Sequence, residues 1–407
     1  MHRSPGPRGV RAVIVAAVLA VGACSGGGHP LSDAADGLGT RGSEQPAATA
    51  AAEGAVPATA ATSTTAPPPD VEVTLAFGGD ILTHTPVNSS AVRAGAAAGL
   101  DYDFGALLAP MEPVIAGVDL ALCHLEAPIA GEGQSITGYP SFHGPPAVVD
   151  GIAAAGYDGC STASNHSLDA GLTGLVAALD RFDAVGLGHT GTARSGQEAA
   201  APRLYEVGGT PIAHLSYTYG FNGYRLPDDA PWAANLIDVD RIAADTRTAR
   251  DAGARLVVVS LHWGSEYRHE PDAQQEEWAR AVTAVEGVDL VIGHHAHVVQ
   301  PIERIDGTWV VFGLGNQLSN QPETTSRDGL TVVVTARGRS DGPLAVTDVA
   351  AVPTWVDRTG GHRVLPTVPS LRPDDLGDAT AGDLDASLVR TMQVVNSRGA
   401  EVPLYDR

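Results

Sequence analysis

Gly293-His294-His295-Ala296-His297-Val298-Val299-Gln300 carries three histidines within four residues, directly after an apolar run at 288–292. The run predicts a buried strand, so the histidines lie where a strand ends and a loop begins. Layered α/β proteins bind ligands at such carboxyl ends of strands, and imidazole is the commonest metal ligand in proteins. The cluster therefore predicts a metal site, against the alternative of three exposed polar loop residues.

Four more apolar runs end in side chains that metal sites use. Taken singly, each has an ordinary alternative, such as a turn residue, a surface acid, a helix cap or a satisfied core histidine. Taken together, at successive strand ends, they predict one shared edge of a sheet. They are Asp80 after 71–77, Glu126 after 118–123, Asn165 and His166 after 159–162, and His262 with Glu266 after 256–261.

This set of side chains fits metal-assisted hydrolysis. A carboxylate can bridge two ions, while amide oxygen and imidazole nitrogen complete their coordination shells. Two ions about 3.5–4 Å apart activate water and clamp a phosphoester, and a histidine such as His166 can protonate the leaving group. No Ser nucleophile elbow is evident, and neither CxxC nor HExxH occurs. Gly186-Leu187-Gly188 cannot be a P-loop, because the chain contains no Lys.

Predicted strands alternate with predicted helices over the first two-thirds of the chain, which favours an α/β fold with buried strands. Helices are expected at 104–116, 145–156, 170–182, 238–253 and 272–285, and a hairpin at 203–216. The later strands, at 308–312, 330–336 and 346–353, follow one another and suggest a second, more antiparallel sheet. Beyond about residue 358 the chain is rich in Pro, Asp and Gly. We expect this extension, 359–407, to hold one helix near 384–395 and to wrap the domain or be partly disordered.

The formal net charge of the chain is −22 at pH 7. Binding to a nucleic-acid backbone requires a basic protein face, and electrostatic adhesion to an anionic membrane requires a polybasic patch. The composition therefore argues against a nucleic-acid polymer as partner and against adhesion of that kind.

The N-terminus is typical of an exported lipoprotein. Arg3, Arg8 and Arg11 precede an apolar segment at 12–23 that has signal-peptide length. Val21-Gly22-Ala23-Cys24 resembles a bacterial lipobox, which predicts a signal peptide at 1–23, lipid on Cys24 and a location on the outer face of the cell membrane. Residues 24–70 are rich in Ala, Thr and Pro and predict a disordered tether. Cys123 and Cys160 are expected either as a disulfide or as buried thiols.

The motifs, taken in order, resemble the CapA family of poly-γ-glutamate capsule biosynthesis proteins, which are related to calcineurin-like metallophosphoesterases. The resemblance covers residues 71 to about 335 and implies a four-layer α/β/β/α metallophosphatase-like sandwich, placed here at 71–358. It also implies an envelope role in making, anchoring or exporting an anionic polymer. The motifs are Gly79-Asp80, Leu125-Glu126, Ser164-Asn165-His166, His262 to Tyr267, His294 to Gln300, and Gly313 to Asn316.

The resemblance also implies roles for single residues. The metal ligands would be Asp80, Glu126, Asn165, His262, His295 and His297, with Mn, Fe or Zn as one or two ions. His166 would be catalytic, and we assign Glu266 to the catalytic set as well. His294 is expected to be a bystander in the loop.

The chain departs from the family pattern at three positions. Leu82 stands where phosphoesterases carry a His two residues after the first Asp, and the nearest imidazole is His84. His124 replaces the usual Asn before Leu-Glu, and Ala296 replaces a proline. The first departure bears on whether a second ion is held.

Three functions follow as hypotheses. The first is a membrane-anchored capsule lipoprotein with a metal-dependent hydrolase site, whose partners would be an anionic polymer and a membrane polymer synthase. The second is an extracytoplasmic metallophosphoesterase that acts on a nucleotide or a cell-wall phosphoester. The third is a non-catalytic module that binds the polymer.

Overall fold

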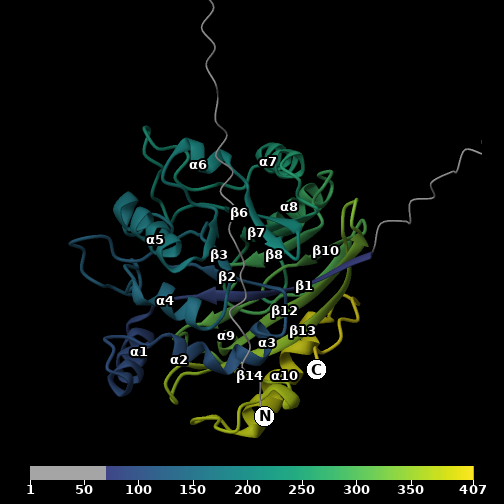
Figure 1. Cartoon of the computed structure of the whole chain (residues 1–407). Helices are drawn as coiled ribbons and strands as arrows, with labels where there is room; N and C mark the ends of the chain where they lie inside the picture. Colours follow the sequence, from purple (N-terminus) through teal and green to yellow (C-terminus); the bar gives the residue numbers. More distant parts are fainter. Residues whose placement is uncertain (1–69, 407) are drawn as a thin grey trace, which may run out of the picture. The chain divides into compact units, whose positions relative to one another are not determined.

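The computed structural model describes residues 70–406, which form two sheets and the helices that cover them (Figure 1). The predicted signal peptide, Cys24 and all of the predicted tether except Asp70 lie outside the described residues. The first sheet has the order β14-β13-β12-β1-β2-β3-β4, and β11 pairs with β1. Its strands are β1 (Asp70–Ile81), β2 (Leu120–Leu125), β3 (Gly159–Ser161), β4 (Gly188–Thr190), β11 (Asn316–Leu318), β12 (Asp328–Arg339), β13 (Ala345–Asp357) and β14 (Arg363–Pro366).

The second sheet has the order β5-β6-β7-β8-β10-β9 and is mostly parallel in its centre. The predicted hairpin is confirmed, because β5 and β6 pair antiparallel around Gly208-Gly209. The strands are β5 (Arg203–Val207), β6 (Thr210–Thr218), β7 (Leu256–His262), β8 (Leu290–His294), β9 (Ile302–Ile305) and β10 (Thr308–Val311).

The helices complete four layers, so the predicted α/β/β/α sandwich is confirmed. Helices α1, α2, α4 and α5 pack outside the first sheet, and α7 and α8 pack outside the second. The helices are α1 (Thr85–Ala98), α2 (Gly105–Leu108), η1 (Ala109–Met111), α3 (Glu112–Ile115), α4 (Ala147–Ala154), α5 (Gly171–Val185), α6 (Gly196–Ala200), α7 (Val239–Asp251), α8 (Ala273–Thr283), α9 (Thr324–Arg327), η2 (Pro369–Leu371) and α10 (Ala381–Val395).

The strand sequences explain the layers. Every residue of β7 is buried, as expected for a parallel strand that is covered on both faces. Val258 points into the core between the sheets, while its neighbours Val257 and Val259 point toward α7 and α8. Successive side chains of a strand alternate between its two faces, and each buried Val contributes about 1.5–3 kcal/mol. Such runs hold the strand ends, and the polar residues on them, at a constant position.

The late strands correct one sequence-based expectation. Of the three predicted strands, only β10 joins the second sheet, where it pairs antiparallel with β9. The other two, β12 and β13, extend the first sheet, where β12 pairs antiparallel with β1. Pairing between Asp70 and Arg339 joins residues far apart in the chain. The periodicity of apolar residues identifies a strand, but it does not show which other strand it will pair with in a sheet.

The helix predicted at 104–116 is also corrected. The segment forms three short pieces, α2, η1 and α3, because Pro110 and Pro113 interrupt a regular helix. Helix α1 was not predicted, although Pro86 near its start and Gly99 in the left-handed conformation after its end are ordinary helix signals.

The C-terminal extension packs on the domain. Strand β14 forms the edge of the first sheet, and α10 packs against β12 and β13. The Asp328 carboxylate on β12 accepts hydrogen bonds from Ser387 (2.6 Å) and from Arg390 (2.8 Å) on α10. Of the two expectations for 359–407, packing against the domain is therefore the one observed in its described part.

Cys123 and Cys160 form a disulfide between the neighbouring strands β2 and β3. The alternative of two buried thiols is thereby excluded in this structure. Both cysteines are buried directly below the strand ends, one residue before His124 and one before Ser161. The cross-link ties together two strands that carry candidate site residues.

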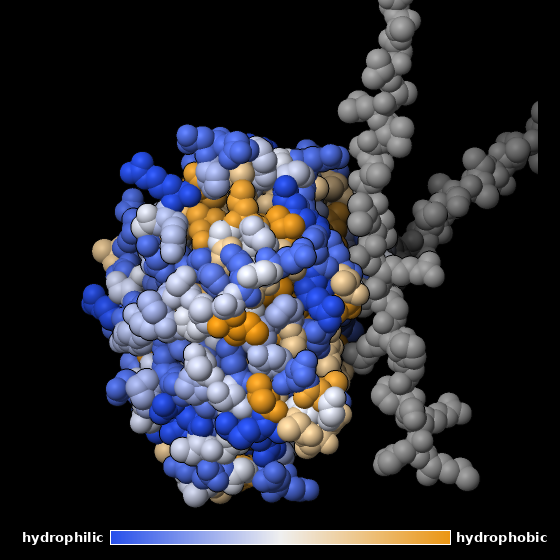
Figure 2. Space-filling model, turned by 90° about the vertical axis from the view of Figure 1, so that its left-hand side faces the viewer, coloured by the Kyte–Doolittle hydropathy of each residue, from blue (hydrophilic) through white to orange (hydrophobic). Residues whose placement is uncertain are grey.

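The strand end that carries Asp80 lies at the left of Figure 1, the side that faces the viewer in Figure 2. On that face hydrophilic residues predominate, and hydrophobic residues form small separate patches. Within residues 70–406, no helix has the length and apolar character needed to cross a bilayer.

His214 on β6 gives a prediction about acid stability. Its Nε2 bonds the Ser260 hydroxyl (2.8 Å), and burial lowers its pKa to about 3. An unfolded histidine has a pKa of about 6.5, so below that pH the unfolded state binds the proton more tightly and stability falls as pH falls. We expect His214→Gln to remove about 2 kcal/mol of the stability loss between pH 7 and pH 5.

The measurement is urea unfolding of both proteins at the two pH values in the presence of a chelator. An equal loss in the variant and the wild type would show that His214 is not the titrating group.

Candidate metal centre

Asp80 stands near the end of β1, at the centre of the first sheet. Its Oδ2 accepts a hydrogen bond from the backbone N–H of His295 (3.0 Å), which links the two sheets at their edge. Gly79 lets the Gly315 carbonyl come close enough to accept from the Asp80 backbone N–H (2.9 Å), because a Cβ at Gly79 would lie 2.2 Å from that oxygen. Burial raises the pKa of Asp80, while the nearby His124 and His297 oppose that shift.

Glu126, directly after β2, is the most informative residue of the site. Both of its carboxylate oxygens are buried, and neither has a hydrogen-bond partner among residues 70–406. Its Oε1 lies 3.9, 3.8 and 3.7 Å from the Nε2 atoms of His166, His262 and His297. These distances are too long for hydrogen bonds.

Ligands of one divalent ion, each about 2.0–2.2 Å from it, stand roughly 3–4 Å apart. A buried carboxylate without a partner costs several kcal/mol. Burial, and then the charge of Asp80, raise the pKa of Glu126 well above its usual range. A cation between Glu126 and the imidazoles would satisfy the unpaired oxygens.

His262 ends β7 and is held on both ring nitrogens. Its Nε2 contacts the Asn165 side-chain oxygen (2.8 Å), and its Nδ1 contacts His124 Nε2 (3.0 Å). The other nitrogen of His124 bonds Ser161 (2.8 Å). Asn165 also donates to Asn222 (3.2 Å). This chain of contacts turns His262 and Asn165 toward Glu126.

His295 and His297 follow β8 with φ angles of +86° and +55°. Non-glycine residues with positive φ are uncommon and concentrate at functional sites. The Nδ1 of His295 is buried without a partner among the described residues. His297 bonds Asn316 through Nδ1 (3.0 Å), which leaves its Nε2 directed at Glu126. The strained turn brings both imidazoles into the same site.

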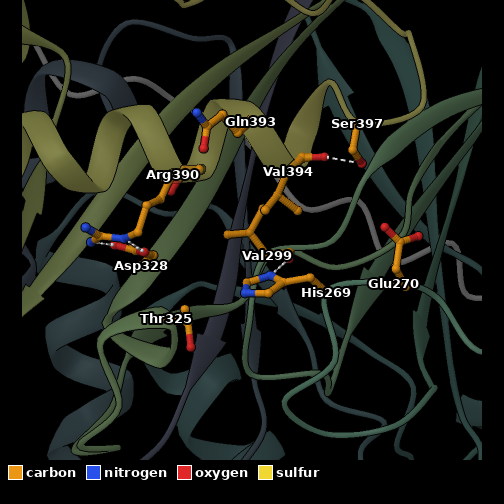
Figure 3. Close-up of a pocket in the computed structure, with 10 residues that line it drawn as sticks. His269, Glu270, Val299, Thr325, Asp328, Arg390, Gln393, Val394 and Ser397 are labelled. Carbon is orange, nitrogen blue, oxygen red and sulfur yellow. Dashed lines mark hydrogen bonds and ion pairs between the residues drawn. The ribbon is translucent and has the colours of Figure 1, made fainter.

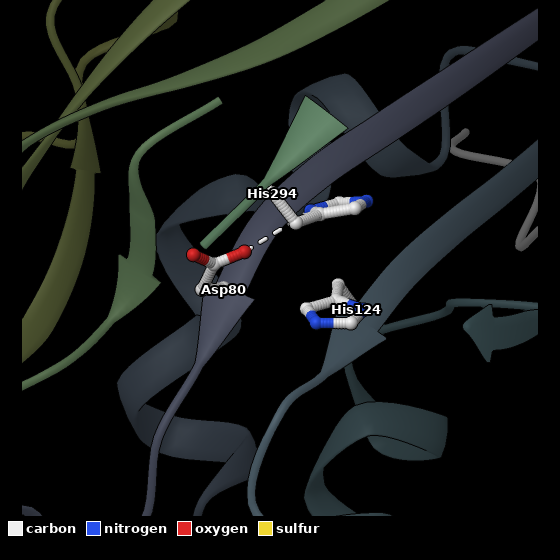
Figure 4. A group of neighbouring side chains, drawn as sticks. All are labelled: Asp80, His124 and His294. Carbon is white, nitrogen blue, oxygen red and sulfur yellow. Dashed lines mark hydrogen bonds and ion pairs between the residues drawn. The ribbon is translucent and has the colours of Figure 1, made fainter. Parts of the chain in front are cut away.

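His294 corrects a sequence-based expectation. It is not a loop bystander: it is the last residue of β8, it is buried, and its Nδ1 donates to Asp80 Oδ1 (3.0 Å). Its ring stacks on His124, with 4.1 Å between centroids. Figure 4 shows these three side chains, with the dashed line joining His294 to Asp80.

By distance alone, Asp80, His124 and His294 form a further group that can hold an ion. None of these three side chains has a buried polar atom without a hydrogen-bond partner among the described residues, so an ion is not needed to satisfy them. The unpaired atoms belong to Glu126 and His295 instead. We therefore read His124 and His294 as residues that position the ligands.

Two other groups share Glu126. One joins Asp80, Glu126 and His297, and the other joins Glu126, His262 and His295; in each, the potential ligand atoms lie within 4.8 Å of one another. The donor set of carboxylate, amide and imidazole suits a divalent transition metal. The residues present thus fit a metal centre in which Glu126 is common to two groups.

Burial keeps the histidines neutral. It lowers the pKa of His262 and His295 well below the usual range, lowers that of His297, and lowers that of His294 to about 3. Neighbouring imidazoles add to the shift for His262 and His295. A neutral imidazole has a free lone pair, so the predicted ligands His262, His295 and His297 are ready to bind a metal at neutral pH.

His166 and Glu266, the predicted catalytic residues, occupy different surroundings. His166 is buried, and its Nδ1 donates to Asp169 (2.7 Å), whose carboxylate also accepts from the Phe142 backbone (2.8 Å). This bond orients the other nitrogen of His166 toward Glu126. Glu266 is exposed, and it forms a group with His295 and His297 whose ligand atoms lie within 4.8 Å.

Leu82, in place of the second ligand histidine, is buried against Ala127 and Phe142. His84 belongs to none of the metal-binding groups found among residues 70–406. Its ring instead packs edge-to-face on Phe142, with centroids 5.3 Å apart. Neither position 82 nor position 84 supplies a ligand to the two groups that share Glu126, which consist of Asp80, Glu126 and His297 and of Glu126, His262 and His295.

Sequence reasoning missed four supporting residues, His124, His294, Asp169 and Asn316, as parts of the site. A signal existed for Asn316, which ends the Gly313–Asn316 motif, and for Asp169, which follows His166 by three residues. His294 belongs to the histidine cluster and His124 ends a predicted strand, but the sequence does not reveal their partners, which come from other strands.

A cavity of about 260 Å³ lies apart from the candidate ligands, between α10 and the loops that follow β7 and β8 (Figure 3). Arg390 reaches Asp328 on one side of it, and His269 bonds the Val299 carbonyl on another. None of the predicted site residues lines this cavity.

Comparison with known proteins gives a family match. Residues 74–321 match the model of a family described as bacterial capsule synthesis protein PGA_cap. The PGA biosynthesis protein CapA of Bacillus subtilis is 31% identical over 192 residues, which are 46% of this chain and 50% of that protein. A probable polyglutamine synthesis accessory protein of Mycobacterium tuberculosis is 26% identical over 227 residues, 53% of this chain and 59% of that protein. The chain thus spans about half the length of the curated relatives it matches.

Solved structures show weaker likeness. A putative 5'-nucleotidase from Staphylococcus aureus has a TM-score of 0.45 and 15% identity, over 78% of this chain and 58% of that chain. The calcineurin-like phosphoesterase YfkN from Bacillus subtilis has a TM-score of 0.42 and 13% identity, over 80% of this chain and 98% of that chain. Superpositions at this level do not bear on activity.

Proposed function

The chain belongs to the bacterial capsule synthesis protein family PGA_cap, and on that premise we propose that it serves the synthesis or export of a glutamate polymer at the cell envelope. We further propose that its buried centre is a metal-dependent hydrolase site. The names of its relatives, a PGA biosynthesis protein and a capsule biosynthesis protein, support the first part. The second part rests on the site itself.

The unpaired carboxylate of Glu126 carries the proposal of a metal site. Three imidazole nitrogens face its Oε1 at 3.7–3.9 Å, and burial excludes the water that would otherwise satisfy it. Asp80, Glu126, Asn165, His262, His295 and His297 would hold one or two ions of Mn, Fe or Zn. When bound, such ions polarise a phosphoryl or carbonyl oxygen and activate water.

The remaining chemistry falls to residues of the chain. Because the Asp169 carboxylate can only accept, His166 carries a proton on Nδ1, and its Nε2 faces the site. Held in this orientation, His166 can transfer a proton to a leaving group. His294 and Asn316 hold Asp80 and His297 in place. Exposed Glu266 lies at the outer side, where it can exchange protons with solvent.

The location and partners belong to the same proposal. The lipobox-like segment ending in Cys24 supports a lipid anchor on the outer face of the cell membrane, with 24–70 as the tether. There the domain would meet a nascent anionic polymer and a membrane polymer synthase.

A second candidate is an extracytoplasmic phosphoesterase that acts on a nucleotide or cell-wall phosphoester. The His166–Asp169 pair favours a phosphoesterase over a binding module, because a module that only holds polymer has no need of an oriented proton donor. The non-catalytic module remains the contrasting outcome of the experiment.

The test is metal analysis of the purified full chain together with hydrolysis of p-nitrophenyl phosphate and bis-p-nitrophenyl phosphate. We expect wild type to retain Mn, Fe or Zn and His297→Ala to lose both metal and hydrolysis. Asp169→Asn should keep the metal and lower the rate about a hundredfold, because only proton transfer is impaired. His269→Ala, which removes an imidazole outside every candidate group, is the matched control.

A wild-type protein that binds none of the three metals would overturn the hydrolase proposal and leave the binding module. The capsule role is tested separately. Deletion of the gene should remove surface polymer, and unchanged polymer would contradict it.

A further inference from the structure

A chain of hydrogen bonds runs beside the candidate metal centre and ends in two arginines. Arg93 on α1 donates to the Ser90 hydroxyl (2.7 Å), and Ser90 contacts His362 Nδ1 (2.7 Å). His362, which lies beyond the family match, has a φ of +59°, a strained value for a non-glycine residue. Its Nε2 reaches the Asn320 side-chain oxygen (3.0 Å). The path joins α1 to the segment between β13 and β14.

Asn320 is the junction of this network. Its side-chain oxygen also accepts from Arg358 Nε (3.3 Å), and its backbone N–H donates to His84 Nδ1 (3.3 Å). Because His84 Nδ1 accepts, the proton of the neutral ring lies on Nε2, which has no hydrogen-bond partner within residues 70–406. His84 therefore presents a free N–H donor. Asn320 holds both the His84 ring and the Arg358 guanidinium through hydrogen bonds.

The charge of this region is opposite to that of the whole chain. Arg93 is exposed and Arg358 is half-buried, and neither has a carboxylate within 4.0 Å in the described part of the chain. The nearby Asp357 carboxylate accepts from the backbone N–H groups of Gly360 (3.1 Å) and Asp378 (3.0 Å). Burial, and then the charges of Arg358 and Arg93, lower the pKa of His362, so both guanidinium groups lie near that ring. In a chain with a net charge of −22 they make this region locally positive.

The network touches the candidate centre through one ring. His84 packs edge-to-face on Phe142 (5.3 Å between centroids), and Phe142 packs edge-to-face on His166 (4.9 Å). Phe142 also donates its backbone N–H to Asp169, the partner of His166. His84 and the proposed proton donor His166 thus pack on the same aromatic side chain.

We propose that Arg93, Arg358 and the Nε2–H of His84 form a subsite for a second anionic group of the substrate, beside the group that the candidate metal centre would bind. This inference rests on the proposed function for the nature of the substrate. Carboxylate and phosphate share the chemistry that guanidinium and imidazole N–H donors recognise. A glutamate polymer supplies such groups at regular spacing, and a diphosphate supplies a second phosphate. A simple phosphomonoester supplies neither.

The positive subsite also resolves a conflict of charge. An acidic protein repels a polyanion over long range. Unpaired arginines at the site reverse the local field and orient an incoming anionic chain. Arg358 and His362 come from outside the residues that match the family model, so the subsite would add selectivity to the shared centre.

The test is the affinity of a fluorescent γ-linked oligoglutamate and of inorganic diphosphate for the full chain, at two salt concentrations. We expect Arg93→Gln and Arg358→Gln each to weaken binding about tenfold, or about 1.4 kcal/mol, since each removes one charge-assisted contact with the anion. The tighter of the two probes identifies the source of the anion. Arg247→Gln, the same charge change on exposed α7, should alter affinity less than about twofold.

Measurement with and without a chelator separates this proposal from the metal site. Weaker binding of the probes by both arginine variants, even in the presence of a chelator, would support the subsite. The subsite would then stand even if the wild-type protein proved to bind no metal and the hydrolase proposal failed. Equal affinities of wild type, Arg93→Gln and Arg358→Gln would overturn the subsite. So would equal weakening by Arg247→Gln, or the absence of binding of either probe to wild type.

Discussion

Glu126→Gln is expected to make the metal-free protein more stable and to abolish its stabilisation by metal. The carboxylate is buried without a partner among the described residues, and burial raises its pKa, so keeping it ionised costs folding free energy. The amide keeps the shape and removes the charge, which should stabilise the metal-free form by about 2 kcal/mol. Since Glu126 is common to two candidate groups, metal affinity should fall by at least about a hundredfold.

Denaturant unfolding with a chelator, and then with Mn or Zn, measures both effects without reference to any substrate. Glu132→Gln, the same change at an exposed acid, should leave both curves unchanged. A metal-free Glu126→Gln protein less stable than wild type would mean that protein atoms satisfy the Glu126 carboxylate, which would contradict its role as a metal ligand.

Gly293→Ala is expected to destabilise the protein by at least about 4 kcal/mol or to prevent folding. A Cβ at this position would lie 1.9 Å from the Phe312 carbonyl oxygen and 2.6 Å from Trp263 Nε1. Those two atoms are hydrogen-bonded to each other (2.9 Å). Strand β8 is paired on one side with β7 and on the other with β10, so the backbone has no room to move. Overpacking of a rigid core usually costs 1–3 kcal/mol, and a backbone clash costs more.

The measurement is urea unfolding followed by circular dichroism. Gly342→Ala serves as control, because a Cβ there meets no atom within 4 Å, and it should change stability by less than about 0.5 kcal/mol. A Gly293→Ala variant that unfolds at the wild-type urea concentration would show that the β8–Phe312 contact yields more easily than the packing suggests.

The local elements were predictable where the pattern was strong. Strand β7, the hairpin of β5 and β6, and the strand before the three histidines all follow from runs of apolar residues and turn signals. The break at 104–116 was within reach of the sequence too, since Pro110 and Pro113 lie inside the predicted helix. The sequence could not predict which sheet β12 and β13 join, because the pairing of strands depends on contacts between residues that are distant in the chain.

The candidate site divides in the same way. Asp80, Glu126, Asn165, His262, His295 and His297 were predicted as ligands because each follows an apolar run, and the structure brings them to one edge; their role as ligands remains a prediction. His294 was misjudged, since its partner Asp80 is distant in the chain and nothing local reveals the contact. The anionic subsite was invisible for the same reason: Arg93, Asn320 and Arg358 meet only after folding.

By itself the sequence determined the strand runs, the metal-binding residue types at their ends and the family of the chain, because periodicity and short motifs are local properties. Only the tertiary structure decided which histidines face Glu126, which ones position their neighbours, and why Gly293 must lack a side chain. Those outcomes depend on how closely two sheets approach each other, and that distance is set by the packing of side chains from the whole domain.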